Sequence, residues 1–319
     1  MSVLVTGASG FVGKALCTQL KAQGIRYRAV IRRESQISDN SDFILIDSID
    51  GQTDWEKALV GITVVVHLAA RVHVMNEISK DPLNEFRRVN VEGSVNLANQ
   101  ASLAGVTRFI YISTVKVNGE STNIGQAFTA HDVPSPKDSY GLSKLEAESQ
   151  IQRISRQTAM EYVIIRPPLI YGANVKGNFN FLERLLVRGT PLPFVGITGN
   201  RRSLVSLSNF VDLLILCLTH QAAANNIFLV SDDEDISTAE LINRICIARR
   251  LPNRNFYLPL FVIRLSMLAI GKSDVYQRLC GSLQLDIEKT KNKLKWKPIE
   301  TLDEALKCNS YSTHENPPT

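Results

Sequence analysis

The 319-residue sequence predicts an α/β fold with a doubly wound parallel sheet and a smaller C-terminal α/β cap. Residues 2–6 form an apolar strand that leads through a glycine-rich turn into a helical pattern, the order expected at the start of such a sheet. Further apolar, β-branched segments alternate with helical stretches up to residue 172. Residues 173–200 then mix glycine, asparagine and two prolines, which indicates the start of a substrate-capping region.

The length lies at the border between one large domain and two joined ones. We expect residues 1–172 to form a dinucleotide-binding domain and residues 173–319 to form mainly the substrate-binding cap. Residues 203–230 are expected to return to the first domain.

Composition excludes several classes of protein. The formal net charge of +5 is spread thinly, without the run of Lys or Arg that nucleic acid binding requires. Isolated arginine pairs suit an anionic small molecule better. Five cysteines stand singly with no metal-ligand spacing, so we expect no metal and a cytoplasmic protein with reduced thiols.

The chain begins directly with a strand, which leaves no room for a signal peptide, and no integral membrane segment is expected. Its most apolar late segment, residues 257–270, contains Pro259 and Arg264 and is too short to span a bilayer. We interpret it as a buried or dimer-facing helix and leave a peripheral membrane contact open.

The N-terminal turn has the pattern of a dinucleotide site. Gly7 permits the tight turn, Gly10 lets the backbone approach a pyrophosphate, and Gly13 allows the helix to pack closely on the strand. Phe11 and Val12 begin the helix, whose N-terminus faces the negative charge.

Three residues after the next two strands bear on the choice of cofactor. Arg32 follows strand 27–31, where an enzyme that prefers NAD commonly has Asp or Glu, and it could pair with a 2′-phosphate. This favours NADP(H) over NAD, although Arg32 and Arg33 could also be a solvated pair. Asp47 and Ile49 follow strand 43–46 and are candidates to border the adenine, but Asp47 could equally be a turn residue.

Strand 63–70 ends in small residues, and Ala69 is expected on the nicotinamide side. His67 is interpreted as a structural strand histidine. Strand 108–112 delivers Ser113 and Thr114 at its carboxyl end, where a doubly wound sheet carries catalytic groups. They could also be ordinary strand-cap hydroxyls.

Tyr140 and Lys144 are four residues apart and therefore share one face of a helix. A tyrosine hydroxyl has a pKa of roughly 10, and a nearby ammonium favours the phenolate. The pair suits proton exchange with a substrate hydroxyl or carbonyl while a hydride moves elsewhere. Any helix could carry such a pair, so its meaning depends on the dinucleotide site.

The ordered motifs resemble those of the extended short-chain dehydrogenase/reductase family, whose members are nucleotide-sugar epimerases, dehydratases and reductases with a Rossmann domain. They are TGASGFVG at 6–13, HLAA at 67–70, NVEG at 90–93, ISTVKVNG at 112–119, the segment from Tyr140 to Lys144, RPPLIYG at 166–172 and NRRSLVSLSNFVD at 200–212.

The resemblance implies roles for the polar residues of the first domain. Tyr140 is the acid/base, and Lys144 binds the nicotinamide ribose and lowers the pKa of the tyrosine. Thr114 bonds the reacting oxygen of the sugar, with Ser113 adjacent and Asn90 a weaker supporting match.

The resemblance also implies that the cap binds a UDP-sugar and that the protein is a homodimer. Arg202 is the first choice to grip the diphosphate, with Arg201 its near neighbour and Arg278 a second contact; Asn178 is a further candidate substrate contact. The dimer would form through the helices that carry residues 90–104 and 140–154.

Three features depart from the family pattern or stand outside it. Sugar 4,6-dehydratases carry Asp-Glu after the catalytic threonine, and Val115-Lys116 cannot do that acid/base work. Asn209 stands where Asp is usual, which leaves the anchoring of the following helix open. The acidic run 232–235 is interpreted as a solvated loop before a capped helix, and the tail 309–319 is expected to be disordered.

We therefore expect NAD(P)-dependent hydride transfer at C4 of a UDP-sugar. The main interpretation is reduction of a UDP-4-keto-6-deoxy-N-acetylhexosamine for surface polysaccharide, favoured by Arg32 and by residues 278–286. The first alternative is a UDP-glucose or UDP-N-acetylglucosamine 4-epimerase. A steroid or flavonoid ketone is a rival substrate, and an inactive dinucleotide-sensing protein is the alternative from another functional class.

Overall fold

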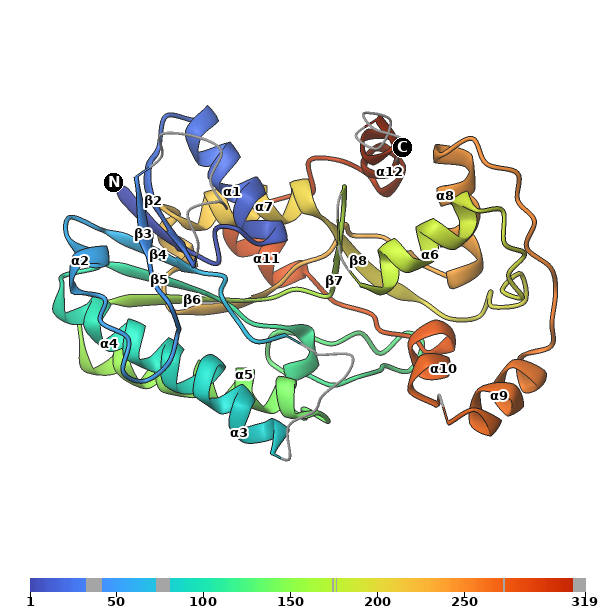
Figure 1. The fold of residues 1–319 in the computed structure, drawn as a ribbon, viewed down its shortest axis with the longest axis horizontal. Coiled ribbons are helices and arrows are strands. Elements are labelled where there is room, and N and C mark those ends of the chain that lie inside the picture. The colour runs from blue at the N-terminus through green and yellow to red at the C-terminus, as the bar shows by residue number, and fades with distance from the viewer. Residues whose placement is uncertain (33–41, 73–80, 174, 176, 272, 312–319) are drawn as a thin grey trace.

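A computed structural model describes residues 1–32, 42–72, 81–173, 175, 177–271 and 273–311. Its larger sheet is parallel, with the strand order β3-β2-β1-β4-β5-β6-β9 (Figure 1). Chain order reverses between β1 and β4, which confirms the doubly wound α/β fold. The strands are β1 (Ser2–Thr6), β2 (Arg26–Ile31), β3 (Phe43–Leu45), β4 (Val64–His67), β5 (Arg108–Ile112), β6 (Glu161–Arg166) and β9 (Asn226–Leu229).

Alternate residues of each strand supply two separate cores, because successive side chains point to opposite faces of a sheet. Val3 and Val5 of β1 lie in one core, and Leu4 lies in the other. The first core is covered by α1 (Phe11–Ala22), α7 (Leu207–Cys217) and α11 (Glu288–Leu294). The second is covered by α2 (Glu56–Leu59), α4 (Ser94–Leu103) and α5 (Ser139–Gln157). Figure 1 shows α1 and α7 on one side of the sheet and α4 and α5 on the other.

Shorter helical turns lie in the connections between the strands. α3 (Pro82–Phe86) runs into a π-helical turn, η2 (Arg87–Gly93), before α4 begins. A single 3-10 turn, η3 (Val115–Val117), follows β5, and another, η4 (Gln221–Ala223), precedes β9. π-helical turns are rare and concentrate at functional sites, which draws attention to η2.

The cap has its own core around a small sheet with the order β10-β8-β7. The strands are β7 (Leu169–Tyr171), β8 (Arg202–Ser206) and β10 (Asp235–Ile236). The helices are α6 (Asn178–Val187), α8 (Thr238–Ala248), α9 (Leu260–Ala269), α10 (Ser273–Cys280) and α12 (Leu302–Tyr311). Within the described ranges, no helix combines the length and apolar character needed to cross a bilayer.

Residues 203–230 belong partly to the cap and partly to the layer of the large sheet. β8 belongs to the small sheet, whereas α7 packs on α1 and β9 pairs with β6 in the large sheet. Phe11, at the start of α1, packs against the core of the cap. The chain therefore passes between the large sheet and the cap more than once. A single domain boundary at residue 172 is only an approximate description of this path.

The interpretation of the acidic run as solvated is wrong for Asp232. This carboxylate is 8% exposed and accepts hydrogen bonds from the Tyr171 hydroxyl, the Ser206 amide and the Asn209 side chain. Asn209 is fully buried and also accepts from the amides of Ile299 and Glu300. An amide both donates and accepts, so Asn209 anchors α7 to two segments at once. Of the tail, residues 312–319 lie outside the described part of the chain.

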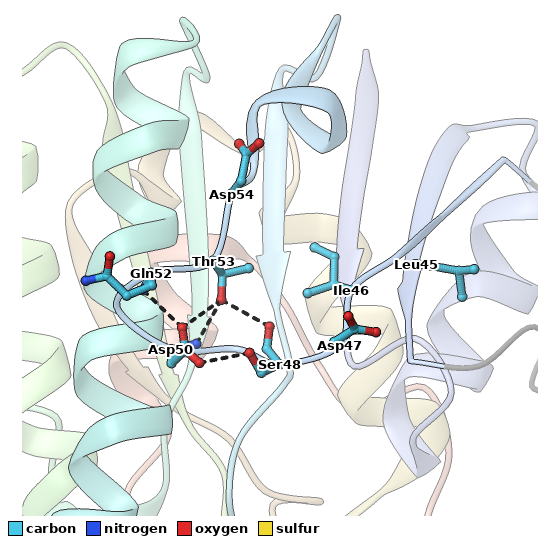
Figure 2. Close-up of a pocket in the computed structure, with 8 residues that line it drawn as sticks. All are labelled: Leu45, Ile46, Asp47, Ser48, Asp50, Gln52, Thr53 and Asp54. Atoms are coloured by element: carbon cyan, nitrogen blue, oxygen red, sulfur yellow. Dashed lines mark hydrogen bonds between the residues drawn. The ribbon is translucent and has the colours of Figure 1, made fainter.

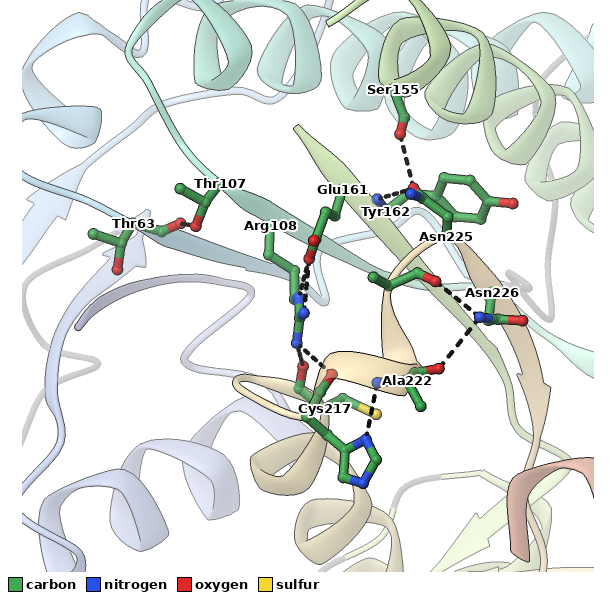
Figure 3. A network of polar contacts seen from close by, with 12 residues as sticks. Thr63, Thr107, Arg108, Ser155, Glu161, Tyr162, Cys217, Ala222, Asn225 and Asn226 are labelled. Atoms are coloured by element: carbon green, nitrogen blue, oxygen red, sulfur yellow. Dashed lines mark hydrogen bonds and ion pairs between the residues drawn. The ribbon is translucent and has the colours of Figure 1, made fainter. Parts of the chain in front are cut away.

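A polar network holds the amino ends of the central strands, opposite the edge that carries the candidate catalytic groups. Arg108, the first residue of β5, donates to Glu161 of β6 and to the carbonyl of Cys217 in α7 (Figure 3). Asn225 accepts from Ser155 of α5 and from the amide of Tyr162 (Figure 3). These contacts join both helical layers to the sheet.

A buried ion pair joins β6 to α5. Arg166 donates through Nε and Nη2 to the two carboxylate oxygens of Glu148 at 2.9 and 2.6 Å, and through Nη1 to Asn118 at 2.9 Å. The side chains of Arg166 and Glu148 are 2% and 0% exposed. The bidentate geometry offsets the cost of dehydrating both charges.

We expect Arg166→Ala to lower the free energy of unfolding by about 3–5 kcal/mol, because it leaves a buried carboxylate unpaired. Replacing both partners with methionine removes both charges and should recover most of that loss. Chemical denaturation measures both variants. Arg88→Ala breaks the exposed pair with Glu85 and, as the control, should change stability by less than about 0.5 kcal/mol. An Arg166→Ala loss no larger than this control would contradict the assignment.

Candidate active site

The candidate site lies where β1, β4 and β5 end side by side. In register, Thr6 of β1 pairs with His67 of β4, and His67 pairs with Tyr111 of β5. The glycine turn, the loop that begins at Leu68 and the segment that begins at Ser113 therefore leave the same edge. In a doubly wound sheet, ligands bind in the crevice outside the carboxyl ends at such a reversal of strand order.

Two glycines of the turn are required by the fold itself. Gly7 has φ +68°, and a Cβ there would lie 2.9 Å from the amide nitrogen of Ala69. A Cβ on Gly13 would lie 2.1 Å from the carbonyl oxygen of Gly7. Helix α1 can therefore pack on the turn only with glycine at position 13.

Gly10 is different, because nothing in its backbone requires glycine. Its φ of −76° and ψ of 175° are open to other residues, and a Cβ would meet only the Gly7 carbonyl oxygen, at 3.1 Å. Gly10 is also the N-cap of α1 and makes no side-chain capping bond, so the first amides, including those of Phe11 and Val12, stay available to an anion. A pyrophosphate that approaches the backbone accounts for glycine here.

A pocket of about 340 Å³ follows β3 (Figure 2). Asp47, Ser48 and Asp50 line it. The Asp50 carboxylate accepts hydrogen bonds from the Ser48 and Thr53 hydroxyls and from the Gln52 amide. Ile49 instead packs against Gly93 of η2, where a Cβ would meet its Cγ2 at 2.8 Å. Asp47 therefore borders an open space, while Ile49 supports the loop.

Arg32 lies directly after β2 and is exposed. Its neighbour Arg33 lies outside the described residues. The position at the end of the second strand is the one expected to face the adenosine ribose.

Lys144 is buried between α5 and β5. Its Nζ donates to the carbonyl oxygen of Ile112 at 2.7 Å and lies 4.4 Å from the centre of the Tyr111 ring. Burial lowers the pKa of Lys144 to about 7, and the Glu148 carboxylate one helical turn away opposes this shift. The ammonium is thus held at the end of the strand that delivers Ser113 and Thr114.

Tyr140 begins the first turn of α5, next to the N-cap Asp138, whose carboxylate accepts from the Gly141 amide at 2.7 Å. Burial raises the pKa of Tyr140, and the charge of Asp138 raises it further. The resemblance implied that Lys144 lowers this pKa, but in the protein alone burial dominates. Tyr140 is consequently a neutral hydroxyl at pH 7 and is suited to donate a proton.

Ser113 and Thr114 differ in their hydrogen bonding. Thr114 caps η3 by accepting from the Lys116 amide at 3.3 Å. Ser113 is 3% exposed, and its hydroxyl has no hydrogen-bond partner in the part of the chain that the structure describes. Because a buried hydroxyl without a partner is costly, the Ser113 side chain is open to a bond with a ligand.

A positioning contact that the sequence motifs did not reveal joins η2 to α5. Asn90 is fully buried and donates to the Ser143 hydroxyl at 3.0 Å. It also donates to the backbone carbonyl of Arg71 and accepts from the backbone amide of Arg71. Ser143, whose hydroxyl donates to the Tyr140 carbonyl, had no predicted role. His67 bonds Thr6 and Ser94, and burial, with the charge of Lys144, lowers its pKa to about 3, so it is the structural histidine that was expected.

Lys116 explains part of the departure from the dehydratase pattern. Its Nζ donates to Asp138 at 2.6 Å and to Glu120 at 2.9 Å. The lysine thereby ties η3 to the residue that caps the helix of Tyr140. It acts as a positioning group beside that helix.

Arg202 and Arg278 form a second charged cluster, on the cap. Arg202 donates to the carbonyl of Gly281 at 3.1 Å. Burial lowers the pKa of Arg202, Glu120 opposes the shift and the neighbouring charge of Arg278 adds to it. Two guanidinium groups near one another with one carboxylate nearby suit a multivalent anion. Arg201 instead bonds the carbonyls of Thr198 and Asn200.

Asn178 is the first residue of α6, and its side chain lies outside the described residues. A further tie that the motifs missed is Asn200, which is buried and bonds both Thr238 and the carbonyl of Leu279 in α10. It links the start of β8 to the helix that carries Arg278.

The model of the NAD dependent epimerase/dehydratase family matches residues 3–231. The chain belongs to this family. A UDP-glucose 4-epimerase of Vibrio cholerae is 47% identical over 308 residues, which cover 96% of this chain and 93% of the relative. Membership makes the chain an enzyme of a family that works with NAD, and the glycine turn fits that dinucleotide.

A more distant relative and a solved structure are also named as 4-epimerases. The N-acetyl-α-D-glucosaminyl-diphospho-ditrans,octacis-undecaprenol 4-epimerase of Escherichia coli O157:H7 is 27% identical and covers 81% of this chain and 76% of its own. The crystal structure of UDP-N-acetylglucosamine 4-epimerase from Bacillus cereus superposes with a TM-score of 0.81 at 20% identity, over 100% of this chain and 98% of that one. The second likeness shows the shared fold.

We expect Gly10→Ala to weaken NAD affinity at least about tenfold, because the new methyl group occupies the approach to the pyrophosphate. Its free energy of unfolding should change by less than about 1 kcal/mol, since the backbone accepts alanine there. Gly13→Ala is the matched comparison, and its clash with Gly7 should destabilise the fold itself. Calorimetric titration and denaturation separate the two effects. Unchanged NAD affinity in Gly10→Ala would contradict the assignment.

Lys144 should make stability depend on pH. Its pKa is about 7 in the fold against an ordinary value of 10.5, so between these values the unfolded chain binds more protons than the folded one. Stability of the nucleotide-free protein should then rise from pH 7 to pH 8.5, by on the order of 1 kcal/mol. Lys144→Met should lack this rise. Parallel pH profiles for the two proteins, measured by denaturation, would refute the lowered pKa.

Proposed function

We propose that this enzyme is a UDP-hexose 4-epimerase that keeps NAD bound through its catalytic cycle. The observation that carries the proposal is the 47% identity with a UDP-glucose 4-epimerase over 96% of this chain. Two features of the site support it. The Tyr140 helix is held against the end of β5, and Arg202 with Arg278 forms a cationic cluster suited to a sugar diphosphate.

The residues divide the work as follows. Gly7, Gly10 and Gly13, with the amides of Phe11 and Val12, hold the dinucleotide pyrophosphate, Asp47 borders the adenine on a loop that Ile49 supports, and Ala69 is on the nicotinamide side. Lys144 binds the nicotinamide ribose. Ser113 and Thr114 hold the C4 oxygen of the sugar, and Arg202, Arg278 and Asn178 bind the remainder of the substrate.

NAD supplies reversible acceptance of a hydride from C4. Tyr140 takes the proton of the C4 hydroxyl as the C4–H bond breaks and a C4 carbonyl forms, and it returns that proton after the sugar has turned. The Ser113 hydroxyl bonds the C4 oxygen throughout, since no other partner for it lies among the described residues. Tyr140 is neutral in the free protein, so the base form requires the positive charges of Lys144 and the oxidised cofactor. The cycle consumes no oxidant.

Reduction of a UDP-4-keto-6-deoxy sugar by NADPH, the main interpretation of the sequence, is the second candidate. Arg32, exposed at the end of β2, is the observation that favours it, because a guanidinium can pair with a 2′-phosphate. The comparisons give this reaction no specific support. Dimerisation through α4 and α5 is part of the proposal and applies to either reaction.

The identity of the nucleotide released by denaturing the purified protein tests the proposal. We expect stoichiometric NAD and, on incubation with UDP-glucose or UDP-N-acetylglucosamine, formation of the galacto epimer, followed by NMR. An empty site together with NADPH oxidation by a UDP-4-keto-6-deoxy sugar would favour the reductase and overturn the epimerase.

Tyr140→Phe should lower kcat by about 10²–10⁴-fold, the contribution typical of a positioned acid/base. Tyr162→Phe is the matched control, because Tyr162 lies at the opposite end of the sheet (Figure 3). Steady-state epimerisation assays measure both variants. Turnover that survives unaltered in Tyr140→Phe would refute the assignment of this residue.

A further inference from the structure

An exposed apolar surface lies on α9 and on the segment that leads into it. We call it the α9 surface; its large side chains are Phe256, Tyr257, Phe261, Leu265, Leu268 and Ile270. Each of these is between 46% and 67% exposed. Figure 1 places α9 at the end of the cap remote from α2 and α4.

The helix itself explains why this surface is exposed. Phe261, Leu265 and Leu268 are spaced i, i+4 and i+7, so they lie along one face of α9. Ile263 is the one buried residue of this helix, and it attaches α9 to the core of the cap. An amphipathic helix normally buries its apolar face, and here most of that face points to solvent.

The stretch of sequence that carries the α9 surface is basic up to residue 273, and the first acidic residue after it is Asp274, on α10. From residue 241 to residue 273 the sequence contains no Asp or Glu, but it contains five arginines and one lysine. Arg244 and Arg249 form ion pairs with carboxylates of other segments. Arg250, Arg254 and Arg264 are exposed, and Arg264 lies on α9 among the apolar residues.

The combination of apolar residues and arginines indicates which kind of partner could cover the α9 surface. In a two-fold dimer the same patch meets itself, so the arginines of one copy would face those of the other with no carboxylate from this stretch between them. An anionic lipid surface instead offers acyl chains to the apolar residues and negative headgroups to the arginines. Phe256 and Tyr257, beside the helix, are aromatic residues of the kind that settle at a membrane interface.

We propose that the α9 surface docks the enzyme peripherally on an anionic membrane. α9 lies in the plane of the lipid headgroups with Phe261, Leu265 and Leu268 inserted, and Arg254 and Arg264 pair with lipid phosphates. α10, which follows α9 in the chain and packs against it, carries Arg278. Docking therefore holds the substrate-binding cap close to the lipid surface.

Flotation of the full-length protein with lipid vesicles tests this proposal. We expect binding to phosphatidylcholine vesicles that contain phosphatidylglycerol, weaker binding as NaCl is raised, and little binding to pure phosphatidylcholine. Failure of the wild-type protein to bind the anionic vesicles would overturn the proposal, and so would equal binding to both compositions.

Two variants separate the apolar and the charged contributions. The double change Phe261→Ser with Leu265→Ser should weaken binding at least about tenfold, because two inserted side chains are lost. Changing Arg254 and Arg264 together to Gln should remove most of the preference for anionic vesicles. The matched control changes Val60 and Val133, which are 67% and 87% exposed and lie outside α9, to Ser and should bind like the wild type.

The remaining outcomes decide against the proposal. If the Ser double variant instead turns a dimer into a monomer in light scattering without altering vesicle binding, the α9 surface is an interface between copies. If the control loses as much vesicle binding as the Ser double variant, adsorption is nonspecific. Thermal unfolding confirms that each variant folds. Epimerase turnover with a soluble UDP-sugar should be unchanged in the α9 variants, so docking and the proposed reaction succeed or fail separately.

Discussion

The buried ion pair between Arg166 and Glu148 is the contact on which the geometry of the site depends. It fixes α5 to β6 at a point one helical turn from Lys144, and its third hydrogen bond, to Asn118, holds the segment after η3. The same Glu148 charge acts on Lys144, where it opposes part of the cost of burying the ammonium. One pair of dehydrated charges thus positions the helix that carries Tyr140 and Lys144 and favours the charged form of that lysine.

A chain of charges connects this helix to the cap. Asp138 caps α5 and pairs with Lys116, Lys116 also pairs with Glu120, and Glu120 acts on Arg202. Backbone pairing runs beside it, since Thr122 pairs with Ser282 and Arg202 pairs with Leu283. The residues proposed for the proton step and those proposed for the diphosphate are therefore parts of one connected framework. Lys116, which argued against dehydration in the sequence, belongs to this framework.

The cap combines an interior typical of a folded domain with an exterior that is not. Its core packs around Tyr171, Phe179 and Ile242, while α9 turns most of its apolar side chains outward. We propose two kinds of anionic partner for the cap. A sugar diphosphate binds at Arg202 and Arg278, and lipid phosphates bind at the α9 surface next to α10. The same property of arginine, its persistent charge and planar fork, serves both.

The sequence by itself determined the doubly wound fold, the glycine turn and the candidates Tyr140, Lys144, Thr114 and Arg202. The succession of strands and helices along the chain and the spacing of motifs are local properties, so they can be read without the tertiary structure. Only the tertiary structure decided which polar groups are satisfied. Asp232 is buried and bonded by Asn209, Ser143 accepts from Asn90, and the Ser113 hydroxyl has no partner within the described ranges. Burial and hydrogen bonding depend on segments more than twenty residues apart, and for that reason neither these contacts nor the raised pKa of Tyr140 could be read from the spacing of residues.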